Sequence, residues 1–151
     1  VAVSSTKIRA ALQEGDIKTA NTYLGYNFML TGKVIDGKKL GKTINYPTAN
    51  LYIKETYKLI PKHGVYVVKS NIDNKDVFGM MNIGYNPTVN GKHQTIETHF
   101  FDFNKNLYGK NLKIELLQRL RDEQKFSSVE ELQSQLHIDK KNALEFIKSH
   151  A

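Results

Sequence analysis

Three glycines and a group of lysines gather between residues 32 and 46, directly before a Pro-Thr-Ala-Asn segment. Glycine lets a ligand approach the backbone closely, and successive amide N–H groups can line a concavity that binds anions. The lysines at positions 33, 38, 39 and 42 add positive charge to the same stretch. The pattern predicts a loop that binds nucleotide phosphates, and we assign to it Gly32, Lys38, Gly41 and Lys42.

The stretch matches a P-loop only in part. The spacing from Gly32 to Lys38 fits G-x-x-x-x-G-K, but Lys39 stands where a P-loop has Ser or Thr to hold magnesium. A P-loop also opens a helix whose N-terminal amides bind the phosphates, whereas Pro47 and a β-prone run follow here. We therefore predict a glycine-rich loop that leads into a strand.

Thr48 and Asn50 supply oxygen atoms at the start of that strand. They are two residues apart, so in a strand their side chains leave on the same face. A hydroxyl and an amide carbonyl suit Mg²⁺ that also binds the phosphates of ATP. Thr48 and Asn50 are thus our candidates for both phosphate and metal binding. The residues alone leave open that the pair is the ordinary polar face of a hairpin.

Glu97 is the candidate for acid–base chemistry. It lies in an otherwise apolar strand, Ile96–Phe101, where an ionisable side chain needs a reason to be present. Phosphoryl transfer requires a group that positions or deprotonates the acceptor hydroxyl, and a carboxylate can do both. The alternative is a charge on the strand's solvent face. We leave His99 out of the catalytic set as a packed residue, and Asp102 as the end of the strand.

The elements that must position these groups are mainly strands. Alternating apolar and polar residues predict strands near 28–36, 48–54, 64–71, 75–84, 95–103 and 111–121, with a hairpin turn at Asp73-Asn74. Six antiparallel strands without intervening helices favour a small closed barrel, because closure removes exposed edges. The predicted fold class is mainly β, or α+β.

Helices are predicted at both ends of the chain. One begins at the serines before Lys7 and closes at Gly15, and a second starts after Asp16 and ends before Gly25. At the other end, Ser127 to Glu130 has the pattern of a capping box. The apolar stripe that follows is interrupted near residues 137–139, which predicts two C-terminal helices.

Composition limits the class of protein. The 151 residues suffice for one domain with a core, and the chain carries a formal charge of +7 and no cysteine. A positive excess attracts polyanions, of which ATP and nucleic acid are both examples. No apolar run reaches membrane-spanning length, and no signal peptide begins the sequence. We expect a cytoplasmic protein without a membrane partner. The lack of cysteine is consistent with a reducing compartment but does not establish one.

Several short motifs together resemble the riboflavin kinase family, above all the C-terminal kinase module of bacterial bifunctional riboflavin kinase/FAD synthetases. The resemblance covers roughly residues 25 to 148 in order. It is carried by Gly32, Gly41, Pro47-Thr48-Ala49-Asn50, Gly64-Val65-Tyr66, Asn82-Ile83-Gly84, Asn86-Pro87-Thr88, Glu97-Thr98-His99 and Leu107-Tyr108-Gly109. It implies a six-stranded Greek-key barrel with a C-terminal helix, and a reaction in which riboflavin and MgATP give FMN and ADP.

The resemblance also implies roles for single residues. Glu97 matches the family's catalytic base, which would accept the proton of the terminal ribityl hydroxyl. A flavin is flat and aromatic, so its pocket needs apolar walls with few polar anchors. Loops around residues 82–90 and 121–126 are expected to fold over it. From these loops we select Asn82, Asn86, Arg121, Glu123 and Phe126 as flavin-binding candidates.

The beginning of the chain resembles a different domain. The segment Val3 to Arg9 is similar to the final motif of the nucleotidyltransferase half of the bifunctional enzymes. We therefore expect residues 1–24 to be a helical remnant or linker of such a domain, and residues 25–151 to be the kinase barrel with its C-terminal helices. The rest of a nucleotidyltransferase site is missing, so adenylyl transfer is not carried over.

Two other classes of function stay open on the sequence. Small basic barrels also bind single-stranded nucleic acid, although the lysines here cluster around one loop rather than among exposed aromatics. The second class is a module that binds a flavin without catalysing a reaction. We expect small-molecule substrates and no nucleic-acid partner.

Overall fold

The structure is a computed structural model that describes residues 5–35, 46–54, 59–88 and 91–150, with only the backbone described for 86–88 and 91–93. The described helices are α1 Ser5–Glu14, α2 Ile17–Leu24 and α4 Val129–His150. The strands are β1 Met29–Ile35, β2 Ala49–Tyr52, β3 Gly64–Ile72, β4 Lys75–Thr88, β5 Gly91–Phe100 and β6 Asn111–Arg121.

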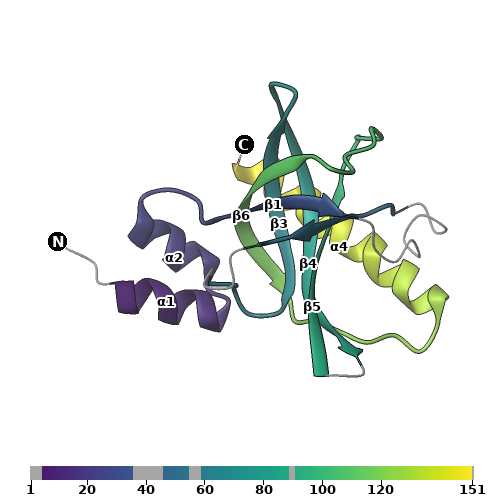
Figure 1. Ribbon diagram of the computed structural model, residues 1–151, viewed down its shortest axis with the longest axis horizontal. Helices are drawn as coiled ribbons and strands as arrows, with labels where there is room; N and C mark the ends of the chain where they lie inside the picture. The colour runs from purple at the N-terminus through teal and green to yellow at the C-terminus, as the bar shows by residue number, and fades with distance from the viewer. Residues whose placement is uncertain (1–4, 36–45, 55–58, 89–90, 151) are drawn as a thin grey trace.

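The six strands form a closed barrel in the order β1-β2-β5-β4-β3-β6 (Figure 1). Each neighbouring pair is antiparallel, including β2 with β5 and β1 with β6, which are distant in sequence. Closure pairs the strand edges that would otherwise be exposed. The predicted mainly β barrel is confirmed.

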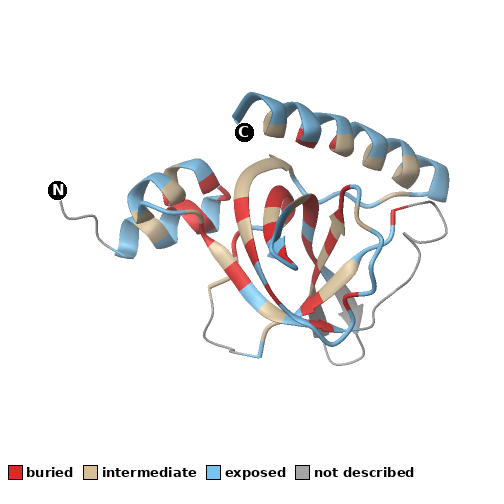
Figure 2. Cartoon of the chain, turned by 90° about the horizontal axis from the view of Figure 1, so that it is seen from above, coloured by how far each residue is buried: buried red, intermediate tan, exposed pale blue. Residues whose placement is uncertain are grey.

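Strand β3 explains how one barrel carries two apolar clusters. Its residues Tyr66 and Val68 face the barrel interior, whereas Val65 and Val67 belong to a second cluster that includes residues of α4. All four are buried, so the strand reads as a continuous apolar run. Figure 2 shows α4 lying along the barrel with its exposed side turned away from the strands. The outer face of the barrel beneath α4 is therefore a second core.

The two N-terminal helices dock on the barrel. Asp16 caps α2 by accepting from the Thr19 amide at 3.2 Å, and Gly25 ends it in the left-handed conformation at φ 80°. Asn21 then joins α2 to the barrel, because its side chain donates to the Leu116 carbonyl at 2.9 Å and accepts from the Phe28 amide at 2.7 Å. Both helices contribute to the interior apolar cluster. Their origin in a preceding domain stays a prediction.

Three predicted boundaries are wrong. Residues 82–88 belong to β4 and β5 begins at Gly91, so most of the expected 82–90 loop is a long hairpin. The interruption predicted near residues 137–139 is absent, since α4 is one helix from Val129 to His150. The helix cap also lies one residue later than predicted: Ser128 Oγ accepts from the Glu131 amide, and the Glu131 carboxylate accepts from the Ser127 amide.

The β3–β4 hairpin turn is confirmed at Asp73 and Asn74. Both have positive φ, 53° and 66°, as a two-residue hairpin turn of the matching twist requires. Asp102, with φ 52°, follows the end of β5 as predicted. Asn and Asp tolerate the left-handed backbone region, where φ is positive, better than other residues with a side chain.

A buried hydroxyl gives a test of the barrel interior. Thr98 is 1% exposed, and its hydroxyl has no hydrogen-bond partner within the described part of the chain. Because an unpaired buried hydroxyl is costly, Thr98→Val is expected to raise the free energy of unfolding by about 1 kcal/mol in urea titrations. The matched control is Ser70→Ala, which removes a bond of 2.9 Å to the Lys113 carbonyl and should lower it by about 1 kcal/mol. Equal losses in both variants would contradict this reading.

Candidate functional site

Three polar residues line up across adjacent strands. Asn50 of β2 is the register partner of Glu97 of β5, and Glu97 is also the partner of Asn82 of β4. Register partners project from the same face of a sheet and lie within contact range. The row continues to Val65 of β3 and Arg121 of β6. Residues from five strands thus meet on one face.

This row lies on the outer face of the barrel, beneath α4. Ile96 and Phe100 of β5 belong to the interior cluster, so Glu97 and His99, which alternate with them, point outward. Val65, in the same row, packs in the cluster that contains residues of α4. Glu97 is half-buried and engaged in an interaction. The helix therefore shields the row from solvent on one side.

A cavity of about 180 Å³ lies between this face, α4 and the segment that follows β6. Val65, Leu132 and Leu136 give it an apolar side. Thr48, Asn82 and Glu97 give it a polar side. It is lined in full by Tyr46, Thr48, Val65, Met80, Met81, Asn82, Glu97, His99, Arg121, Gln124, Phe126, Leu132, Leu136 and Asp139.

Arg121 joins β6 to α4 at one end of the cavity. Its Nε and Nη2 donate to the two carboxylate oxygens of Asp139, at 2.8 and 2.7 Å, and Gln135 donates to the same carboxylate at 2.9 Å. The Arg121 guanidinium also lies 5.9 Å from the ring centre of Phe126. Asp139 is 2% exposed, so this is a buried ion pair with its hydrogen bonds made.

Two histidines hold the segment that enters β2. Nδ1 of His99 is 2.8 Å from the Pro47 carbonyl, and the hydroxyl of Tyr46 is hydrogen-bonded to Nδ1 of His137. Burial lowers the pKa of His99 below its ordinary value, outweighing the opposite effect of its bond to Pro47. Burial likewise raises the pKa of the Tyr46 phenol, which keeps its proton. His99 is therefore neutral near pH 7 and donates its Nδ1 proton to the carbonyl.

The structure brings some of the predicted site residues together at the cavity and places others elsewhere. Thr48, Asn82, Glu97, Arg121 and Phe126 line the cavity, and Asn50 lies beside Glu97. Glu123 does not line the cavity. Its carboxylate lies against Gly84, in the space that a side chain at position 84 would occupy. Asn86 lies in β4, where only the backbone is described. Lys38, Gly41 and Lys42 fall outside the described residues.

Gly32 lies in β1 and is not among the residues that line the cavity. A Cβ atom at this position would collide with the backbone oxygen of Tyr52 and the side chain of Leu51. The close approach of β1 and β2 therefore accounts for a glycine at this position. Its assignment to the phosphate loop stays a prediction.

Several residues of the cavity are not among those predicted from sequence. They are Tyr46, Val65, Met80, Met81, His99, Gln124, Leu132, Leu136 and Asp139. Leu132 and Leu136 belong to the apolar stripe of α4, whose spacing indicates packing and nothing more. His99 is the one residue of this set that the sequence could have indicated, because it is two residues from Glu97 and so lies on the same face of the strand.

The oxygen donors fit a metal that arrives with phosphates. Among the residues that the structure describes, no three His, Asp or Glu side chains cluster as a metal site. Mg²⁺ commonly uses one or two protein oxygens together with substrate phosphates and water. Thr48 and Asn50 have the chemistry for that arrangement, at the cavity edge where Asn50 pairs with Glu97.

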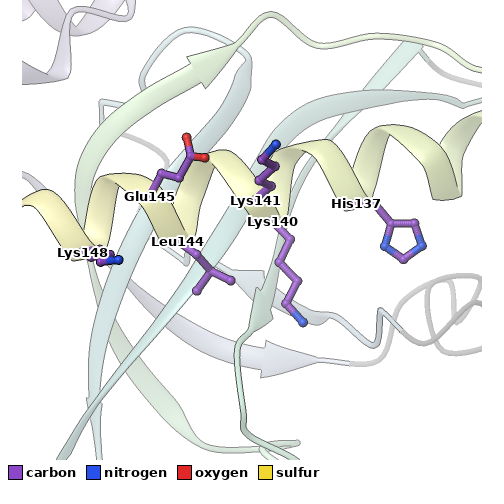
Figure 3. A pocket seen from close by; sticks show the side chains of 6 residues that line it. All are labelled: His137, Lys140, Lys141, Leu144, Glu145 and Lys148. Atoms are coloured by element: carbon purple, nitrogen blue, oxygen red, sulfur yellow. The ribbon is translucent and has the colours of Figure 1, made fainter.

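A second hollow, of about 410 Å³, runs along α4 (Figure 3). All the residues that line it belong to this one helix: His137, Lys140, Lys141, Leu144, Glu145 and Lys148. It is a basic surface rather than a pocket between elements. None of the strand residues described above contributes to it. We assign no ligand to it.

Comparison with known proteins identifies relatives over nearly the whole chain. A family model described as riboflavin kinase (Flavokinase) matches residues 24–147. The bifunctional riboflavin kinase/FMN adenylyltransferase of Bacillus subtilis is 41% identical over 150 residues, which cover 97% of this chain and 47% of that protein. The chain therefore spans about half the length of this relative.

Solved structures share the fold. A Streptococcus pneumoniae structure titled macrolide-efflux protein is 39% identical with a TM-score of 0.85, over 92% of this chain and 45% of that chain. The riboflavin kinase of Trypanosoma brucei superposes with a TM-score of 0.54 at 21% identity, over 80% of this chain and 79% of its own. The second likeness is one of fold alone. In the described part of the present chain, no helix has both the length and the apolar character needed to cross a bilayer.

Proposed function

Because the chain belongs to the riboflavin kinase family, we propose that it transfers the γ-phosphate of ATP to the terminal ribityl hydroxyl of riboflavin, giving FMN and ADP. The observation that supports this most is the pairing of Asn50 with Glu97 at the edge of a cavity with an apolar side. It brings an oxygen donor for metal-bound phosphates next to a carboxylate that can take a proton. A kinase needs both within reach of one hydroxyl.

In this proposal Glu97 is the general base. Its carboxylate accepts the hydroxyl proton as the oxygen attacks the γ-phosphorus, and so raises the nucleophilicity of that oxygen. Thr48 and Asn50 would hold Mg²⁺ together with the ATP phosphates. The bound metal would supply positive charge to stabilise the negative charge on the phosphoryl group. The glycine-rich loop with Lys38, Gly41 and Lys42 would complete the phosphate site.

The flavin ring is proposed to enter between α4 and the barrel. Val65, Leu132 and Leu136 offer the apolar contact that a flat aromatic ligand requires, and Asn82 offers a polar anchor. The cavity of about 180 Å³ is smaller than typical ligand pockets of about 300–1,000 Å³. Binding therefore requires the ring to extend through the mouth or the segment around Phe126 to move outward.

The chain is proposed to act as the kinase part of a longer cytoplasmic protein. The B. subtilis relative is named for two activities, and this chain aligns with just under half of it. An N-terminal nucleotidyltransferase domain would be the partner of the barrel in such a protein. Its presence is tested by the size of the protein made from the native gene.

The activity is tested by incubating the 151-residue chain with riboflavin, ATP and Mg²⁺ and following FMN by chromatography. FMN that appears only with all three components supports the proposal. Protein that binds flavin and turns yellow without forming FMN would favour a flavin carrier. Salt-sensitive binding of oligonucleotides without a metal, and no FMN, would favour the nucleic-acid class.

Replacement of Asn50 tests the metal site. Asn50→Ala removes one oxygen donor, and it is expected to raise the Mg²⁺ or ATP concentration for half-maximal rate roughly tenfold or more. The matched control is Asn71→Ala in β3, an exposed asparagine bonded to Asp76 at 3.2 Å and absent from the cavity lining. Unchanged Mg²⁺ and ATP dependence in Asn50→Ala would remove this residue from the site.

A further inference from the structure

Thr48 lies just outside the strand pairing that holds its neighbours. The β2–β5 register begins with Ala49 opposite Thr98, and β2 itself begins at Ala49. Thr48 is exposed, so packing does not hold its side chain either. Its orientation therefore depends on how the backbone before Ala49 is fixed.

His99 fixes that backbone with its side chain. The imidazole Nδ1 lies 2.8 Å from the carbonyl oxygen of Pro47, which belongs to the peptide bond between Pro47 and Thr48. A carbonyl can only accept a hydrogen bond, so Nδ1 must carry the proton. This bond extends the attachment of the segment to β5 beyond the last ladder pair. Proline limits the remaining freedom, because its ring fixes φ.

The imidazole ring is itself held in place. The rings of Tyr46 and Phe101 meet it edge-on, with centroid distances of 5.1 and 5.7 Å. Tyr46 is in turn hydrogen-bonded to His137 of α4. Tyr46, which precedes Pro47, and the imidazole that contacts the Pro47 carbonyl are thus both connected to rigid elements, and the His99 donor cannot turn away without disturbing this packing.

We propose that His99 is a positioning residue, which holds Thr48 at the phosphate end of the site through its bond to the Pro47 carbonyl. This inference rests on the proposed function. His99 acts on substrate only through the backbone, and so it is not a catalytic residue. Its loss is expected to weaken the use of MgATP and to leave the apolar flavin contacts intact.

The variants are His99→Phe, which keeps an aromatic ring and removes the donor, and His99→Asn, whose amide N–H can replace the Nδ1 proton. We expect His99→Phe to raise the KM for ATP about fivefold to tenfold, the scale of one hydrogen bond. His99→Asn should restore most of the loss. Because His99 also lines the cavity, riboflavin affinity is measured by fluorescence without ATP, and in His99→Phe it should fall by a smaller factor than the KM for ATP rises. His150→Phe, on the exposed end of α4, is the matched control.

Each outcome decides one claim. An unaltered chain that makes no FMN refutes the proposed function, and this inference with it. An active chain whose ATP KM is unaffected by His99→Phe refutes the inference alone. So does failure of His99→Asn to rescue, or an equal loss of riboflavin affinity, because either would indicate general disruption.

A spectroscopic measurement tests the geometry without any activity. Long-range proton–nitrogen NMR spectra of the imidazoles should show His99 as the Nδ1–H tautomer, and the Thr48 amide signal should shift in His99→Phe and return in His99→Asn. An Nε2–H tautomer would overturn the inference, since the Pro47 carbonyl would then lack its donor.

Discussion

The Glu97→Gln variant is expected to turn over riboflavin at least about 100-fold more slowly than the unaltered chain. Glutamine keeps the size of the side chain and can still make hydrogen bonds, but it cannot accept the hydroxyl proton. A 100-fold loss corresponds to roughly 2.7 kcal/mol of transition-state stabilisation. The measurement is the steady-state rate of FMN formation at saturating riboflavin and MgATP.

Two companion measurements separate a base from a binding residue. Riboflavin affinity should stay near that of the unaltered chain, because the loss concerns the transition state rather than substrate binding. Glu115→Gln is the matched control: this half-buried strand carboxylate accepts from Asn27 at 3.2 Å and does not line the cavity. Near-normal turnover in Glu97→Gln would refute its role as base.

The barrel was predictable because its strands obey local rules. The Asp73-Asn74 dipeptide marks the β3–β4 turn in the sequence, because Asp and Asn tolerate the positive φ that both residues adopt in the structure. Alternation of apolar and polar residues marks the strands beside it. The continuity of α4 was not predictable in the same way. Asp139 interrupts the apolar stripe, but in the structure it lies within one helix and forms an ion pair with Arg121 of β6. A contact between separate elements has no local signature.

The site was predictable residue by residue, but its assembly was not. Glu97 attracts attention as a charge in an apolar strand, and Asn50 as part of a short polar motif. Their direct pairing follows only from the order of the strands, which places β2 beside β5. The contribution of α4 depends on which barrel face the helix covers. Neither fact can be derived from spacing along the chain.

Removal of the Asp139 carboxylate is expected to have the largest effect on stability. Asp139→Ala leaves the Arg121 guanidinium and the Gln135 amide without their acceptor in a largely buried place. Breaking one partner of a buried pair typically costs about 3–5 kcal/mol. For a chain of this size the midpoint of thermal unfolding should fall by roughly 6–20 °C. Circular dichroism during heating, together with urea titration, measures both quantities.

A double variant distinguishes the uncompensated charge from simple loss of packing. Replacing both partners, as Arg121→Met with Asp139→Leu, should recover much of the stability lost by Asp139→Ala, because buried pairs often exchange for apolar residues at little cost. Lys105→Ala is the matched control, since it breaks a solvent-exposed pair with Asp73 at 3.5 Å and should change stability by less than about 1 kcal/mol. If Asp139→Ala behaved like Lys105→Ala, the pair would not hold α4 on the barrel. If the double variant were as unstable as the single one, the lost hydrogen bonds and shape, rather than an unpaired charge, would account for the effect.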